Sequence, residues 1–200
     1  MYTFTSIDKV TNWVIRKCIK NKSAHCVHGA MNYTKNKMPY SIFWIDTDNG
    51  SEFLNGLVIK WTIENDYLFT RSRAGKKNDN AHVERANRVY VRELIGYSRF
   101  TSSRAFELIN KIYLIDEMYV NFFVPGRKIT EKIYNRATGK SRKIFDKPRT
   151  AYNRVLEYYN QTDQSEEICK PLQEVYNSLD PWELLSERNK LLRQLGKLKK

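Results

Sequence analysis

The order of apolar and polar positions predicts short strands that alternate with helices along the first hundred residues. Two β-rich, alternating stretches, "YTFTSID" and "NWVIRK", flank a turn near Lys9–Asn12. The expected elements are, in order, strands at 2–8 and 12–17, a helix at 23–35, a strand at 41–46, a helix at 52–65, a strand at 66–70 and a helix that Asn80 caps. This order is typical of an α/β protein in which helices cover a mixed sheet.

The second half of the chain changes character twice. Ser102 or Ser103 caps a long amphipathic helix that ends at Pro125-Gly126, and a last helix follows Pro181. Between Arg127 and Arg154 ten basic residues face only Glu131 and Asp146, and "NRATG" favours a hairpin turn. We therefore expect four parts: a core at 1–100, a long helix at 101–126 that closes it, a basic segment at 127–160 and a helical tail at 161–200.

Charge points to a polyanionic partner. The chain has 35 Lys and Arg against 22 Asp and Glu, a formal net charge of +13, and nucleic acid is the simplest such partner. The alternative is a basic protein from a lysine-rich proteome. The start lacks the pattern of a signal peptide, and Asp116 and Glu117 interrupt the longest apolar run, so we expect a cytoplasmic protein without a membrane span.

The cysteines and histidines offer little chemistry. Three scattered cysteines without a CxxC pair predict reduced thiols. His25, Cys26 and His28 lie close together, but no second ligand pair follows at zinc spacing.

Acidic residues gather where the third expected strand ends. A carboxylate at the end of a buried strand is fixed by the strand and open to solvent, which suits a metal site. Asp48 has this place and precedes a sharp Asn49-Gly50 turn, while Asp46 and Glu52 also have ordinary structural explanations. Thirty-five residues lie between Asp48 and Glu84, and Arg88 could form an ordinary helical ion pair with Glu84.

Together with "IDTDNGSEF", "FTRSRAGKKNDNAHVERANR", "YVNFFVP" and "FDKPRTAYNRVL", this spacing resembles the DDE integrase core of insertion-sequence transposases and retroviral integrases. The resemblance implies a ribonuclease H-like fold, and it implies that Asp48 and Glu84 are the second and third acids of a triad. That triad would hold two Mg²⁺ or Mn²⁺ ions for DNA strand cleavage and transfer. The implied partners are transposon ends and target DNA, bound by a homo-oligomer of the full-length form.

One part of the family's pattern has no match. The first aspartate would lie ahead of Met1, on a strand before "YTFTSIDKVTNW", and Asp8 matches a family position that is not catalytic. The resemblance thus implies an N-terminally truncated copy that is inactive alone, unless Asp8 or Asp46 replaces the missing acid. Three hypotheses stay open: an integrase-type transferase, a non-catalytic DNA-binding remnant, and an RNA-hydrolysing relative, which "KKNDNAHVE" disfavours.

Basic residues crowd the stretch around Glu84. They would neutralise phosphates beside the scissile bond, although a solvated loop and a salt-bridged helix are the alternative. The predicted DNA contacts are Arg71, Arg73, Lys76 and Lys77 before the helix and Arg85, Arg88 and Arg92 along it. The segment from Arg127 to Arg154 is a second candidate.

Overall fold

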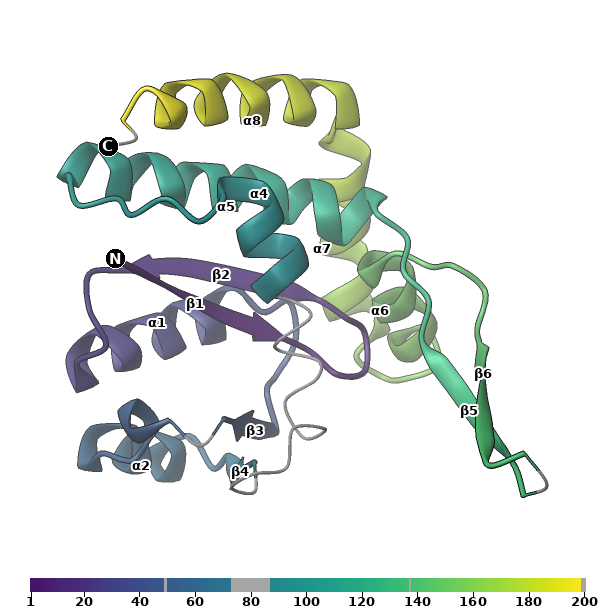
Figure 1. The fold of residues 1–200 in the computed structure, drawn as a ribbon. Helices are drawn as coiled ribbons and strands as arrows, with labels where there is room; N and C mark the ends of the chain where they lie inside the picture. Colours follow the sequence, from purple (N-terminus) through teal and green to yellow (C-terminus); the bar gives the residue numbers. More distant parts are fainter. Residues whose placement is uncertain (49, 73–86, 137, 199–200) are drawn as a thin grey trace.

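The structure, a computed structural model, describes residues 1–48, 50–72, 87–136 and 138–198. Strands β1 (Tyr2–Ile7) and β2 (Val14–Ile19) form an antiparallel hairpin, and β3 (Trp44–Thr47) pairs in parallel with β4 (Leu68–Arg71). In Figure 1, helix α1 (Ala24–Lys37) lies on one side of the β1–β2 hairpin and α5 (Ser103–Phe123) on the other. The mixed α/β class expected from the sequence is confirmed.

The remaining elements surround this centre. Helix α8 (Pro181–Gly196) lies along the outer side of α5, and α2 (Gly56–Glu64) packs on α1. The other described elements are the turns η1 (Ser51–Phe53) and η3 (Arg88–Arg92), helix α4 (Glu93–Ile95), strands β5 (Ile129–Asn135) and β6 (Lys140–Phe145), and helices α6 (Ala151–Tyr159) and α7 (Ser165–Ser178).

Several expected boundaries move by a few residues. The third strand begins at Trp44 rather than at 41, and the following helix begins at Gly56 after the short turn η1. Asn55 causes that later start, because its side chain accepts a hydrogen bond from the Val58 N–H and caps the helix. Ser102 caps α5 as predicted, since its side chain accepts from the Ala105 N–H.

Helix α5 closes the outer edge of β2 with its side chains. The backbone N–H groups of Val14, Arg16 and Cys18 donate to Asn121 Oδ1 (2.9 Å), Glu117 Oε1 (2.5 Å) and Asn110 Oδ1 (3.1 Å), respectively. Asn121 Nδ2 also donates to the Val14 carbonyl at 2.9 Å. A strand edge that would otherwise need another strand is thus satisfied by one helix face.

A buried ion network ties α8 to this centre. Asp116 accepts from Arg16 Nη1 at 2.8 Å and from Arg188 Nη1 at 2.7 Å, so it joins β2, α5 and α8. The Arg16 side chain is fully buried and lies 5.0 Å from the centre of the Tyr113 ring. Since both charges of the Arg16–Asp116 pair are out of water, each one requires the other.

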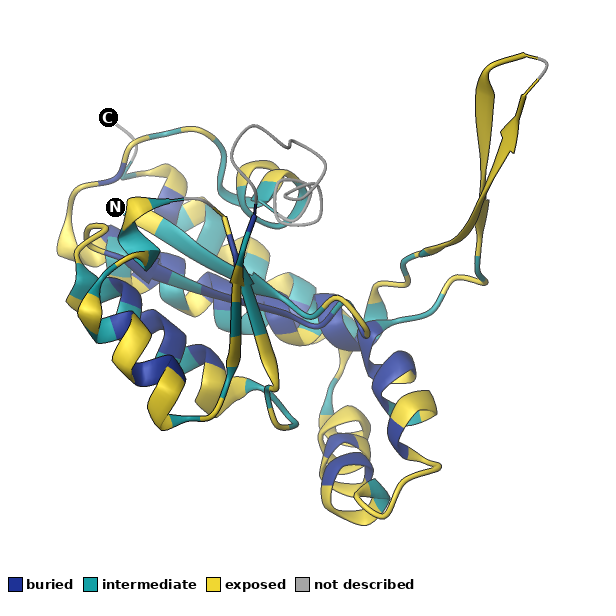
Figure 2. Cartoon of the chain, turned by 90° about the horizontal axis from the view of Figure 1, so that it is seen from below, coloured by how far each residue is buried: buried dark blue, intermediate teal, exposed yellow. Residues whose placement is uncertain are grey.

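Burial divides the molecule into a packed body and an exposed arm. Apolar clusters fill the spaces between β2 and α5, between α1 and α2, and around α6 and α7. Strands β5 and β6 form a hairpin whose residues are exposed along both strands (Figure 2). The hairpin projects beyond the body and packs into none of the three clusters.

Candidate functional site

Asp48 directly follows β3 and is exposed. Its Oδ1 accepts a hydrogen bond from the Gly50 N–H at 3.1 Å, which shapes the turn. A Cβ atom on Gly50 would lie 2.5 Å from Glu52 Oε2 and 3.0 Å from Asp48 Oδ1. The glycine therefore leaves room for two carboxylates to flank the turn.

The two acids near Asp48 already have cationic partners. Lys9 Nζ contacts Asp46 Oδ2 at 2.5 Å, and Thr70 Oγ1 donates to Asp46 Oδ1 at 2.9 Å. Lys22 Nζ contacts Glu52 Oε1 at 2.6 Å, and this hydrogen bond lowers the pKa of Glu52. Asp46 and Glu52 are thus neutralised locally.

Asp8 serves the hairpin turn. Its Oδ2 accepts from the Thr11 N–H (2.8 Å), the Thr11 hydroxyl (2.5 Å) and the Tyr40 hydroxyl (2.9 Å). These contacts hold the turn in which Asn12 has a φ of 66°. Its place in the turn agrees with the non-catalytic interpretation made from the sequence.

Five of the predicted site residues, Glu84, Arg73, Lys76, Lys77 and Arg85, lie outside the described residues. The convergence of Asp48 and Glu84 therefore stays a prediction. Across the described ranges, no three His, Cys, Asp or Glu side chains form a group that could hold a metal ion.

The other three predicted DNA contacts lie on two elements. Arg71 is half-buried at the end of β4. Arg88 and Arg92 are exposed on η3, where Arg88 Nε lies 3.8 Å from Glu93 Oε1 and the Arg92 guanidinium lies 5.7 Å from the centre of the Tyr97 ring. The ion pair of Arg88 is with Glu93, one of the ordinary partners that a surface helix provides.

The histidine and cysteine cluster of α1 has structural contacts. His28 Nε2 lies 3.2 Å from Asn32 Nδ2, and its ring meets Trp61 edge-on at 6.2 Å between centres. These contacts join α1 to α2, as expected of packing residues.

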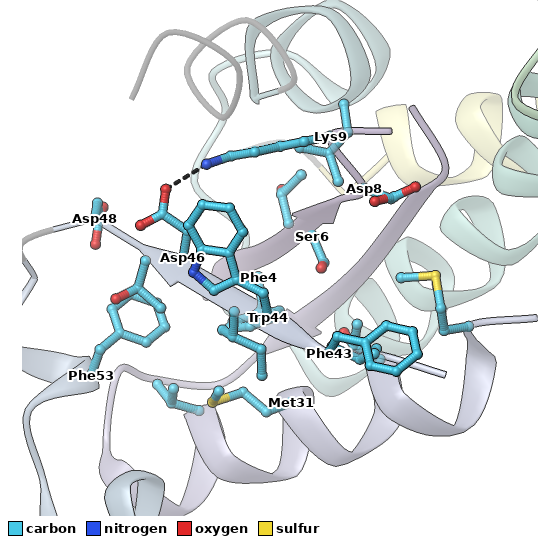
Figure 3. Close-up of a pocket in the computed structure, with 18 of the residues that line it drawn as sticks. Phe4, Ser6, Asp8, Lys9, Met31, Phe43, Trp44, Asp46, Asp48 and Phe53 are labelled. Atoms are coloured by element: carbon cyan, nitrogen blue, oxygen red, sulfur yellow. Dashed lines mark hydrogen bonds and ion pairs between the residues drawn. The ribbon is translucent and has the colours of Figure 1, made fainter. Parts of the chain in front are cut away.

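A cavity of about 500 Å³ lies between β1 and β3. Figure 3 shows Lys9 crossing over it to Asp46, while Met31 rises into it from α1. Asp48 and Glu52 stand among the residues that line it. No local sequence pattern indicates this cavity, because its two walls are strands whose separation depends on tertiary packing.

The β5–β6 hairpin carries the basic segment seen in the sequence. Lys132 stands directly opposite Lys143 in the register, and Asn135 opposite Lys140. Its root is fixed to the body: Gly126 and Arg149 exchange backbone hydrogen bonds of 2.9 and 3.1 Å, and Arg154 Nη1 contacts Asp146 Oδ2 at 2.7 Å. The arm thus combines a fixed root with a charged, fully exposed stem.

Comparisons with known proteins add one relative. The chain is 33% identical over 130 residues to a Sinorhizobium fredii (strain NBRC 101917 / NGR234) protein described as "Uncharacterized protein y4rM". The match covers 65% of this chain and 37% of that protein, so the chain spans well under half of its relative. No protein-family model matches the sequence. Within the described residues, no helix is both long and apolar enough to span a bilayer.

Proposed function

We propose that this chain binds DNA and belongs to the lineage of integrase-type transposases, whose complete members cleave and join DNA strands. The observation that carries the DNA part is the β5–β6 arm. From Arg127 to Lys147 the sequence has eight Lys or Arg and two acidic residues, and the two strands between them are exposed throughout.

The physics of this arm favours a polyanionic partner. A two-stranded hairpin is marginally stable by itself, and like charges directly opposite each other, as at Lys132 and Lys143, destabilise it further. Phosphates would remove that repulsion, and a two-stranded ribbon has the width that a DNA major groove admits. We expect the loop residues Arg73, Lys76 and Lys77 to add phosphate contacts.

The arrangement of the body supports the lineage. An antiparallel hairpin, a helix, and a parallel strand pair joined by a second helix follow one another as a ribonuclease H-like protein requires. Asp48 ends the first strand of the parallel pair beside the cavity, the place that the resemblance gives to the second acid. The same lineage implies a homo-oligomer on transposon ends and target DNA in the full-length form.

The described carboxylates fit a two-metal site only in part. Asp48 offers a carboxylate, whereas Asp46 and Glu52 are held by Lys9 and Lys22. Oxygen-rich Mg²⁺ or Mn²⁺ coordination would need Glu84 and a further acid. We therefore derive no metal-dependent step from these residues, and we favour the non-catalytic DNA-binding alternative for residues 1–200 alone.

DNA binding is tested by fluorescence anisotropy with a duplex of random sequence at several salt concentrations. Replacing Lys132, Arg142 and Lys143 by Gln should make the slope of log K against log salt shallower by roughly 0.9 for each phosphate that the variant no longer neutralises. Replacing the exposed residues Lys60, Lys170 and Lys190 by Gln removes the same charge elsewhere and should change the slope less.

A second set, Arg73, Lys76 and Lys77, is replaced by Glu in parallel, and we expect a shallower slope there as well. Equal slopes for the arm variant and its control would contradict the role of the arm. Catalysis is tested by nicking of supercoiled DNA with Mg²⁺ or Mn²⁺, where we expect no cleavage by residues 1–200. Cleavage that Asp48→Asn abolishes would favour the active transferase instead.

A further inference from the structure

Strand β1 presents an unused row of backbone groups to the cavity. The N–H groups of Val14, Arg16 and Cys18 point from β2 to α5. Their partners across the hairpin are Ile7, Thr5 and Thr3, so these three pairs are the non-hydrogen-bonded pairs of the ladder. The backbone groups of Thr3, Thr5 and Ile7 therefore point away from β2, toward the side where the cavity lies.

Strand β3 presents a similar row. The carbonyls of Phe43 and Thr47 accept from Leu68 and Ser72, both at 2.9 Å, and so point toward β4. By alternation, the backbone groups of Trp44 and Asp46 point to the other side of β3. Within the described ranges β1 pairs only with β2 and β3 only with β4.

The two open edges run in opposite directions along the cavity. Lys9, just after β1, contacts Asp46 and lies 5.1 Å from the centre of the Trp44 ring. Phe4, near the start of β1, lies 6.2 Å from Phe53, which follows β3. A strand inserted between them would be parallel to one edge and antiparallel to the other.

The cavity has two chemically different sides. Toward α1 it is lined by apolar side chains, among them Phe4, Val27, Met31 and Ile45. On the opposite side of the strands stand Asp46 and Asp48, with the ring of Trp44 (Figure 3). An extended peptide alternates its side chains between two such sides.

Three buried hydroxyl groups line the same cavity. Thr5, Thr34 and Thr47 each have an Oγ1 atom that is buried and has no hydrogen-bond partner among the described residues. Buried hydroxyls without partners are costly. Three of them around one cavity indicate that a polar occupant completes it.

We propose that this cavity binds an extended segment of a partner polypeptide as a β-strand between β1 and β3. The segment carries apolar side chains on the α1 side and hydroxyl or cationic side chains on the side of Asp46 and Asp48, where charge complementarity favours them. Unused backbone rungs on both walls favour a strand over a compact small molecule. This inference does not depend on the proposed DNA binding.

The test uses the 200-residue chain and a capped seven-residue peptide in which valine alternates with threonine or lysine. Binding is followed by isothermal titration and by the fluorescence of Trp44 and Trp61, which line the cavity. We expect saturable binding and slower amide exchange at Thr3, Thr5 and Ile7. The same peptide with N-methyl groups on alternate residues should bind at least tenfold more weakly.

A variant pair tests the β1 edge itself. Thr5→Pro deletes an N–H that points away from β2, so the β1–β2 hairpin tolerates it, as edge strands tolerate proline. It should weaken peptide binding by about fivefold, because one ladder hydrogen bond is removed. Thr5→Val keeps the N–H and should bind the peptide nearly as tightly as the unchanged chain does.

Several outcomes would overturn the inference. They are no binding at millimolar peptide, binding without protection of the β1 amides, and equal binding of the N-methylated peptide. A small apolar dye that occupies the cavity while the peptide does not would identify a small-molecule pocket. Concentration-dependent self-association that protects the same amides would identify a second copy as the occupant.

Discussion

Glu117 should make the folded protein less stable as the pH rises from about 4.5 to 7. Its side chain lies between α5 and β2, where Oε1 accepts from the Arg16 N–H at 2.5 Å. Burial raises the pKa of Glu117 from 4.5 to about 7, against the opposing effects of the Arg16 guanidinium and of this hydrogen bond. The folded protein therefore prefers the protonated acid, while the unfolded chain ionises freely.

The sign and size follow from proton linkage. Between pH 4.5 and 7 the folded state binds more protons than the unfolded state, so the free energy of unfolding falls as the pH rises. The stabilisation is complete below pH 4.5 and lost above about pH 7. A pKa difference of this size corresponds to about 3 kcal/mol, an order-of-magnitude figure.

Urea unfolding followed by circular dichroism between pH 4.5 and 8.5 measures this dependence. Glu117→Gln retains an acceptor for the Arg16 N–H but cannot ionise, so the fall should largely disappear in the variant. Glu107→Gln changes an exposed residue of the same helix and should retain the fall. If the unchanged chain and Glu117→Gln have parallel stability curves, the carboxyl of Glu117 is not the group responsible.

Two further substitutions test buried polar groups. Asp116→Ala removes the shared partner of Arg16 and Arg188 and should lower the free energy of unfolding by about 3–5 kcal/mol, because a buried guanidinium loses its counter-charge; exposed Asp163→Ala is the control, and an equal loss in both would refute the network's role. Thr47→Val deletes an unpartnered buried hydroxyl and should raise the same free energy by about 1 kcal/mol, whereas a loss of that size would show that the hydroxyl has a partner.

The sequence alone determined the local elements and the α/β class. Alternation in "YTFTSID", the Ser102 cap and the turn residues of "NRATG" act over a few neighbouring positions, so their outcome is visible in the residues themselves. Boundaries moved where a side chain such as Asn55 capped a helix later than the apolar pattern indicated. The place of Asp48 after β3 was predictable for the same local reason.

Only the tertiary structure decided which strand edges are closed and which stay open. Asn110, Glu117 and Asn121 satisfy the outer edge of β2 from a helix about a hundred residues away, which no local pattern encodes. The open edges of β1 and β3, and the unpartnered hydroxyls between them, likewise arise from how separate segments pack. Such features depend on long-range packing, whereas the residues that make them are ordinary asparagines, glutamates and threonines in the sequence.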